Sequence, residues 1–286
     1  MSRRITVWLM APLALLAVAA GWRWQATQSI DGNAIVIAGG DGGGLPRADA
    51  MQEGFDTQGL RAAVDYADSQ GATALLVTRH GHLVLEHYAR GADAGTLVDG
   101  GELAQALLML AAGVAVTQSA MALPAEQGSD DARLVAAIAA ASGQPYPLFL
   151  SHAVWQPLNA APAQWRSSGV RARAADWLRV AGLLLHDGRF EGKQVLPPGW
   201  VQRLGRSRPA SGAEPFTTGE VAVLRGTGAT LLWLAPRLDL AILCVADAPP
   251  PGVAVDETRL ARMIIRSLRD LPAVGGAQLN DLVPGH

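Results

Sequence analysis

The chain of 286 residues contains very little lysine and cysteine. Only one of its 23 basic residues is a lysine, Lys193, so a catalytic amine can come only from that side chain or from the N-terminus. The single cysteine, Cys244, cannot form an internal disulfide, and its apolar neighbours predict a buried strand. A net charge of -2 provides no basic stripe, so we expect no nucleic-acid partner. Half of the residues are hydrophobic and 17% are charged, which is typical of a folded protein with a large core.

Residues 1–24 have the pattern of an export segment. Arg3 and Arg4 precede an apolar run, and the small residues 17–19 suit a signal-peptide cleavage region. The run of about 18 residues is also long enough to cross a bilayer as an uncleaved anchor. More arginines precede the run than follow it, which places the body of the protein outside the cytoplasm. We expect a periplasmic protein, or one anchored in the inner membrane, and both alternatives stay open.

The rest of the chain divides into three parts. Residues 25–54 contain a run of five glycines and one aspartate at positions 39–44, which predicts a flexible linker. Residues 55–270 have the regular hydrophobic patterns of one folded domain. Residues 271–286 form an irregular tail.

The domain is predicted to have an α+β fold. Helical patterns and strand patterns both occur, and the strands come in hairpins, which produce antiparallel pairing. We expect an antiparallel sheet of about five strands, flanked by an N-terminal and a C-terminal helix, with a reduced helical region in the middle. The predicted helices are 55–69, 102–116, 131–141, 148–154, 175–186 and 256–269. The predicted strands are 73–79, 83–90, 220–224, 229–235 and 240–246.

Several segments resemble the serine β-lactamase-like family, which includes class C β-lactamases, DD-peptidases, esterases and 6-aminohexanoate-dimer-type amidases. They are TALLVTRHG at 73–81, LVLEHYARG at 83–91, WQPL at 155–158, ADWLRVAGLLLHDG at 175–188, GKQVLPPGWV at 192–201 and the hairpin at 226–240. Together they cover most of residues 55–270. The resemblance implies a β-lactamase/transpeptidase-like fold in a degenerate and shortened member.

Members of this family use a Ser-x-x-Lys pair, which places a nucleophile and an amine one turn apart on a helix. Counting back from the apolar end of the predicted helix places Glu102 and Gln105 at these two positions. No serine in the chain is followed three positions later by a lysine, so the ordinary dyad is excluded. Glu102 and the nearby Asp99 also fit the start of a helix, where carboxylates are stabilised by the helix dipole.

The family's second element is a Tyr-x-Asn or Tyr-x-Ser. The resemblance places it at Gln127 and Ser129, where the tyrosine is missing. The tyrosines of this chain are Tyr66, Tyr88 and Tyr146, and none is predicted to lie at that position.

The third element, a strand with a basic residue and a glycine at the substrate edge, is retained as Arg225, Gly226 and Thr227. An arginine at this position could hold a ligand carboxylate through two hydrogen bonds. A glycine-containing hairpin turn is the simpler alternative.

Neither a Ser-His catalytic pair nor a histidine metal site is expected from the sequence. Ser151 and His152 are adjacent, so on a helix their side chains point about 100° apart and cannot form a nucleophile–base contact. His80 and His82 flank a predicted turn, but no third ligand follows at a known spacing. We therefore expect neither a metal nor a cofactor.

The sequence thus favours an exported, serine-hydrolase-like protein that is catalytically inactive. Such a pseudoenzyme would act by binding a cell-wall or protein partner, or by partnering an enzyme. The alternative is an active hydrolase of an ester, amide or peptidoglycan-like substrate with a rearranged site. A decaying gene without a selected role is a third possibility.

Overall fold

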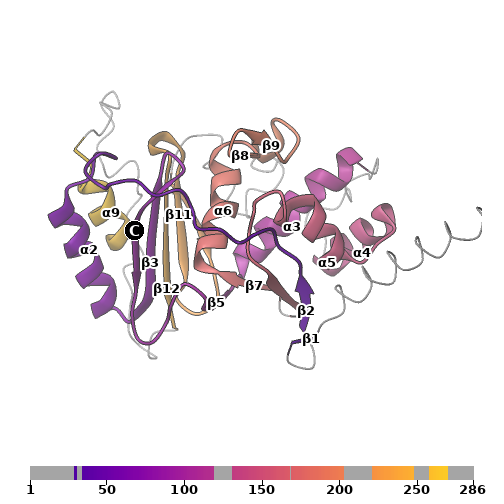
Figure 1. Ribbon diagram of the computed structural model, residues 1–286, viewed down its shortest axis with the longest axis horizontal. Helices are drawn as coiled ribbons and strands as arrows, with labels where there is room; N and C mark the ends of the chain where they lie inside the picture. The colour runs from indigo at the N-terminus through magenta and orange to yellow at the C-terminus, as the bar shows by residue number, and fades with distance from the viewer. Residues whose placement is uncertain are drawn as a thin grey trace, which may run out of the picture.

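The computed structural model describes residues 29–30, 34–118, 131–167, 169–202, 221–247 and 258–269. The predicted export segment, the predicted tail and the positions Gln127 and Ser129 lie outside these residues. The described part has an α+β fold with antiparallel sheets, as predicted (Figure 1).

The main sheet has five strands in the order β10–β11–β12–β3–β4, and every neighbouring pair is antiparallel. It confirms the predicted sheet of about five strands. Its members are β3 (Ala72–Arg79), β4 (His82–Tyr88), β10 (Ala222–Arg225), β11 (Leu231–Ala235) and β12 (Leu240–Ala246). The turn between β3 and β4 consists of His80 and Gly81, whose φ angles of 48° and 78° match the primed turns that suit a twisted hairpin.

Two separate hydrophobic clusters cover the two faces of this sheet. Side chains alternate between the faces of a strand, so Leu75 and Val77 of β3 pack with the helices α2 (Thr57–Ser69) and α9 (Arg259–Arg266). Leu76 between them packs on the opposite face with α3 (Glu102–Gln118) and α6 (Ala174–Leu185). Figure 1 shows α2 and α9 on one side of the sheet and α6 on the other. This is the predicted flanking by the N- and C-terminal helices.

A second five-stranded sheet was not predicted. Its order is β1–β2–β6–β7–β5. The strands are short, and β6 and β7 are rich in alanine, glycine and arginine rather than in β-branched residues, so their sequences give only a weak strand signal. The members are β1 (Ser29–Ile30), β2 (Ala34–Ile37), β5 (Leu97–Asp99), β6 (Ala163–Arg166) and β7 (Gly169–Arg173).

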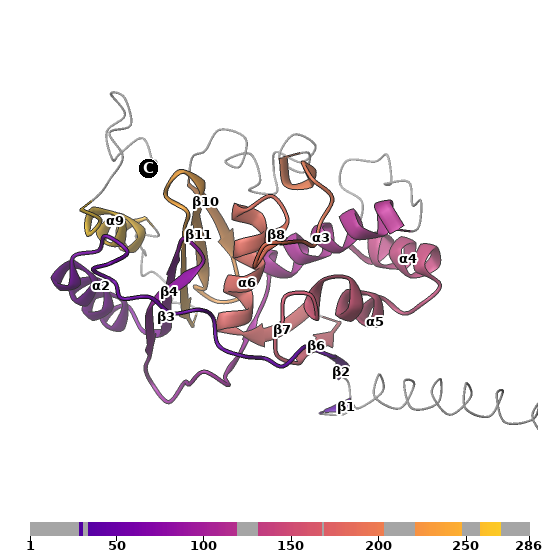
Figure 2. The same ribbon diagram turned by 45° about the horizontal axis from the view of Figure 1, so that its top comes forward.

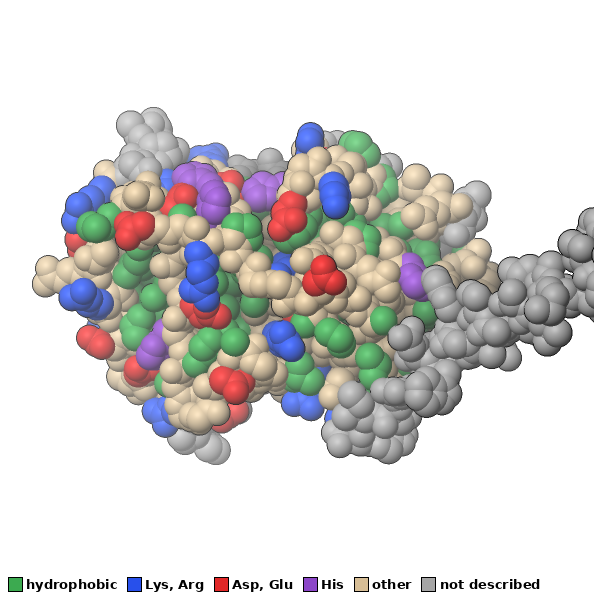
Figure 3. Space-filling model, in the orientation of Figure 1, with side chains coloured by type: hydrophobic (Ala, Val, Ile, Leu, Met, Phe, Trp, Pro, Cys, Tyr) green, Lys and Arg blue, Asp and Glu red, His purple; other side chains and the backbone are tan. Residues whose placement is uncertain are grey.

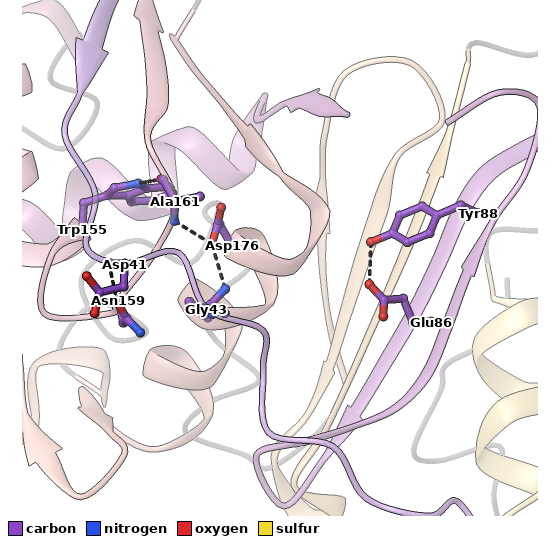
Figure 4. Close-up of polar contacts among 9 residues, drawn as sticks. Asp41, Gly43, Glu86, Tyr88, Trp155, Asn159, Ala161 and Asp176 are labelled. Carbon is purple, nitrogen blue, oxygen red and sulfur yellow. Dashed lines mark hydrogen bonds and ion pairs between the residues drawn. The ribbon is translucent and has the colours of Figure 1, made fainter. Parts of the chain in front are cut away.

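The prediction of a flexible linker at residues 25–54 was wrong for its described part. β2 pairs with β6, and the glycine-rich segment after it packs closely against the loop at Asn159 and Ala160. A Cβ atom on Gly39 would lie 2.2 Å from the Ala160 carbonyl oxygen, and the Asp41 N–H donates to the Asn159 Oδ1 atom at 2.7 Å (Figure 4). The glycines are present because the backbone approaches a neighbour, not because the chain is free.

A buried ion pair also holds this segment. The Arg179 guanidinium donates to the Asp176 carboxylate at 2.8 Å and to the Gly43 carbonyl oxygen, and both charged side chains are almost fully buried. The same Asp176 oxygen accepts the Ala161 N–H at 3.2 Å (Figure 4). Burial raises the pKa of Asp176, against the opposing effect of Arg179. One cation–anion pair on α6 therefore joins two segments that are far apart in the sequence.

The middle of the chain is helical, and Figure 2 shows these helices together on the side of the molecule away from α2 and α9. They are α3, α4 (Asp131–Ser142), α5 (Tyr146–Leu150) and the π-helical turn η1 (Ser151–Trp155). The remaining elements are the small hairpin β8 (Arg189–Phe190) and β9 (Lys193–Gln194), and the 3-10 turn η3 (Pro236–Leu238).

Among the described residues, no single helix is long and apolar enough to cross a membrane. The pair formed by residues 131–142 and 146–155 passes by length and composition, with a bend of 74°. These helices contribute buried side chains such as Ile138, Phe149 and Leu150 to the core, which accounts for their apolar composition.

Candidate functional site

The start of α3, where the family resemblance places the nucleophile, lies directly against the end of β10. Gly101 has a φ of +52°, and a Cβ atom at this position would lie 2.8 Å from the backbone of Gly226. A Cβ atom on Gly226 would in turn lie 3.3 Å from the Asp99 carbonyl oxygen. The fold therefore brings together two of the predicted site segments, the helix start and the Arg225–Thr227 strand end.

Glu102 makes the contact that defines this site. Its carboxylate oxygen Oε2 accepts the backbone N–H of Arg225 at 2.9 Å. The carboxylate also lies in the first turn of α3, where the helix dipole stabilises negative charge. The predicted role of Glu102 at a helix start is consistent with this position. Sequence reasoning missed its partner, although Gly101 and Gly226 were a signal that two backbones approach closely here.

Gln105 lies one turn after Glu102 and is exposed. Its backbone N–H continues the helix by donating to the Gly101 carbonyl oxygen at 3.4 Å. An amide side chain has no amine that could take up a proton near neutral pH. Lys193, the one lysine, is exposed on the hairpin strand β9 and not on α3.

The segment Arg225–Thr227 ends β10 and begins the turn into β11. The Gly226 N–H donates to the Thr230 carbonyl oxygen at 2.8 Å, and the Thr230 N–H donates back to the Thr227 carbonyl oxygen at 3.4 Å. These bonds give the segment a structural role in the hairpin. The exposed positions of Arg225 and Thr227 also place both at the surface beside Glu102.

Tyr88 and Tyr146 have other roles than that of a catalytic phenol. The Tyr88 hydroxyl donates to Glu86 on the same strand at 2.8 Å (Figure 4). Tyr146 is buried, its ring meets Trp165 edge-on at 5.0 Å, and burial raises the pKa of its hydroxyl. A raised pKa keeps the phenol protonated, so it cannot serve as a general base.

The other candidate nucleophiles are also engaged or buried. The Ser151 hydroxyl donates to the Ala38 carbonyl oxygen at 2.7 Å, which agrees with the conclusion that it is not paired with His152. Cys244 is buried in β12, as predicted, and burial raises its pKa to about 12. Its thiol therefore stays protonated and poorly nucleophilic.

The predicted turn histidines, His80 and His82, both lie beside Glu53. Within the described ranges, no group of three or more histidine, cysteine, aspartate or glutamate side chains is arranged to hold a metal ion.

Comparison with solved structures identifies the fold. A protein assigned as a 6-aminohexanoate-dimer hydrolase, from Bacillus anthracis, matches with a TM-score of 0.60 and 14% identity over 86% of this chain and 93% of that one. A β-lactamase-like structure from Bacteroides dorei matches with a TM-score of 0.59 and 12% identity over 75% and 99%. A β-lactamase from Mycobacterium bovis matches with a TM-score of 0.51 and 16% identity over 65% and 91%.

No protein-family description and no curated protein matches the sequence. The likeness is therefore one of fold, and it agrees with the antiparallel main sheet and with the helices on its two faces. The chain therefore has a serine β-lactamase-like fold, the fold of these solved structures.

Proposed function

We propose that this protein is a pseudoenzyme of the serine β-lactamase-like fold, exported from the cytoplasm and acting by binding. The observation that carries the proposal is the contact between the Glu102 carboxylate and the Arg225 N–H.

Acyl transfer needs an activated nucleophile and backbone N–H groups that stabilise the negative oxygen of the tetrahedral intermediate. Glu102 stands where the family resemblance places the serine, and it supplies neither a hydroxyl nor a thiol. Its own negative charge lies on a backbone donor beside the helix start, where a developing oxyanion would be repelled. Gln105 cannot supply the amine that activates a serine. Each of these features acts against catalysis by the usual route.

The binding role rests on Arg225. It lies at the exposed end of β10, next to Gly226 and Thr227, and its guanidinium could hold a carboxylate on a cell-wall fragment or a protein. The predicted export segment would bring this site to the periplasm, either free or held at the inner membrane. The partner would then be met outside the cytoplasm.

Covalent labelling tests the inactivity. The full-length chain, purified in a mild detergent, is incubated with a fluorophosphonate and with a fluorescent penicillin, and a class C β-lactamase serves as the positive control. We expect no mass shift of this chain under conditions that fully label the control. An adduct mapped to a serine would support the active hydrolase with a rearranged site and would overturn the proposal.

Export is tested separately by adding protease to spheroplasts, which should digest the body of the protein; full protection would contradict an exported location.

A further inference from the structure

A groove of about 460 Å³ lies at the end of the main sheet that is remote from Glu102. Strand register fixes this placement. Arg225 pairs with Leu231 at one end of β11, whereas Ala235 at the other end pairs with Leu240, which in turn pairs with Arg79. The groove is lined by the residues that follow Arg79, by the end of α6, by the β8–β9 hairpin and by Asp239.

Three histidines line this groove, and each lies beside a carboxylate. The His80 Nδ1 atom is 2.7 Å from the Glu53 Oε2 atom, and the His186 Nε2 atom is 2.7 Å from the Asp239 Oδ1 atom. The His82 Nδ1 atom lies 3.2 Å from the second Glu53 oxygen, close enough for an ion pair but without hydrogen-bond alignment. Figure 3 shows histidine side chains gathered with acidic ones at the upper edge of the molecule.

The carboxylates determine what these imidazoles present to the groove. An ionised carboxylate oxygen accepts a hydrogen bond from the ring nitrogen that faces it, so this nitrogen carries the hydrogen in His80 and His186. In a neutral imidazole the other nitrogen then has a free lone pair and accepts hydrogen bonds. A neutral ring therefore presents an acceptor at that nitrogen, and a protonated ring presents a second donor.

The charged side chains in and behind the groove also favour a cation. Among the described residues that line it are the carboxylates of Asp239 and Glu191 and one permanent cation, Arg189. Glu53 lies behind His80 and His82 with its side chain only 14% exposed. The buried Arg79 donates to the Glu53 backbone carbonyl, so it partly offsets that charge. While the histidines are neutral, negative charge exceeds positive charge.

The groove also has apolar lining residues. Leu45 and Leu178 are almost fully buried, and Leu185 and Phe190 are half-buried beside them. Such a surface removes an aliphatic chain from water and thereby favours its binding.

The backbone supports a functional interpretation of the polar wall. His80, Glu191 and Asp239 have φ angles of 48°, 45° and 46°, in the left-handed region. Histidine and aspartate are among the residues that tolerate this region, whereas glutamate is not favoured there. Asparagine or glycine would suit the turn at Glu191 better, so a carboxylate is kept at a conformational cost.

We propose that this groove binds an amphipathic cation, a primary ammonium group carried on a short aliphatic chain. The ammonium donates hydrogen bonds to the Asp239 and Glu191 carboxylates. The chain lies along Leu45, Leu178 and Phe190.

The test uses full-length protein and two probes of equal length and opposite charge, hexylammonium and hexanoate, with isothermal titration calorimetry at about pH 8 and about pH 5.5. We expect hexylammonium to bind about ten-fold more tightly than hexanoate at the higher pH, because each hydrogen bond to a charged group is worth about that factor. At the lower pH, the protonated His186, whose pKa is raised by the hydrogen bond to Asp239, should weaken hexylammonium binding about ten-fold. Tighter binding of hexanoate, or no binding of hexylammonium, would overturn the proposal.

Two variants assign the binding to this groove. Asp239→Asn removes the charge while keeping a residue that tolerates a left-handed backbone, and Glu191→Gln removes the charge of an exposed turn residue. Each should weaken hexylammonium binding about five-fold or more. The matched control is Asp68→Asn, which neutralises a carboxylate that pairs with a histidine, His87, outside the groove. Equal affinity in Asp239→Asn, Glu191→Gln and the unmodified chain would exclude this groove as the binding site.

Discussion

His186 ends α6, and its contact with Asp239 ties that helix to the turn between β11 and β12. The hydrogen bond to Asp239 raises the pKa of His186 above its ordinary value of 6.5, although partial burial acts in the opposite direction. A pKa that is raised in the folded state means that the protonated imidazole stabilises the fold. This contribution is fully present below about pH 6.5 and is lost as the pH rises through the folded-state pKa.

We therefore expect His186→Gln to destabilise the protein more at about pH 5.5 than at about pH 9. Both side chains of the pair are about a third exposed, so solvent limits the loss to about 0.5 kcal/mol, or about 1–2 °C in Tm. Differential scanning calorimetry at the two pH values measures the difference. Asp239→Asn should reproduce it, and an equal loss at both pH values would contradict the assigned role of the ion pair.

At the residue scale, sequence reasoning located positions but not partners. The regular pattern of α3 placed Glu102 at a helix start, and its apolar neighbours placed Cys244 inside a strand; both placements were correct. The partner of Glu102, the Arg225 N–H, lies 123 residues further along the chain. His80 was placed beside a predicted turn without a partner, because nothing in the sequence connects it with Glu53, His186 or Asp239. Contacts of this kind follow from strand order, which periodicity does not give.

At the element scale, the segment after β2 is the clearest departure from expectation. Glycine runs without a hydrophobic period usually indicate a flexible chain. A backbone that packs closely against a neighbour also needs residues without a Cβ atom, so the sequence alone does not distinguish the two cases. Strands with nearly continuous apolar runs, such as β3 and β12, were predicted within one residue of their bounds. β6 and β7 were missed because short strands rich in glycine, alanine and arginine depend on pairing for their conformation.

The packed segment predicts different costs for two glycine substitutions. In Gly39→Ala the new methyl group would meet the backbone of Ala160 and Ala161, which cannot move as a side chain can. We expect a loss of about 1–3 kcal/mol in the free energy of unfolding, measured by urea denaturation. Gly44→Ala is the matched control, because no atom lies within 4 Å of its Cβ position. A flexible linker would instead make the two substitutions equally harmless.

At the scale of the whole molecule, the site at Glu102 and the histidine groove occupy opposite ends of the main sheet. The five residues of β11, Leu231–Ala235, separate them, and at about 3.3 Å per residue this is about 15 Å. Glu102 contacts Arg225, whereas Asp239 contacts His186, so the two carboxylates have no partner in common in these contacts. Two sites so arranged should be energetically independent.

A double-mutant cycle tests this independence. Glu102→Ala removes a helix-terminal charge and a hydrogen bond, and it should cost about 1 kcal/mol; Asp239→Asn should cost about 0.5 kcal/mol. The double variant should show the sum of the two losses within about 0.5 kcal/mol in urea denaturation, because separated sites without shared partners are additive. Glu102→Ala should also leave hexylammonium affinity unchanged. A coupling energy above about 1 kcal/mol would mean that the sheet transmits changes between its ends, and occupancy of the groove would then alter the site at Glu102.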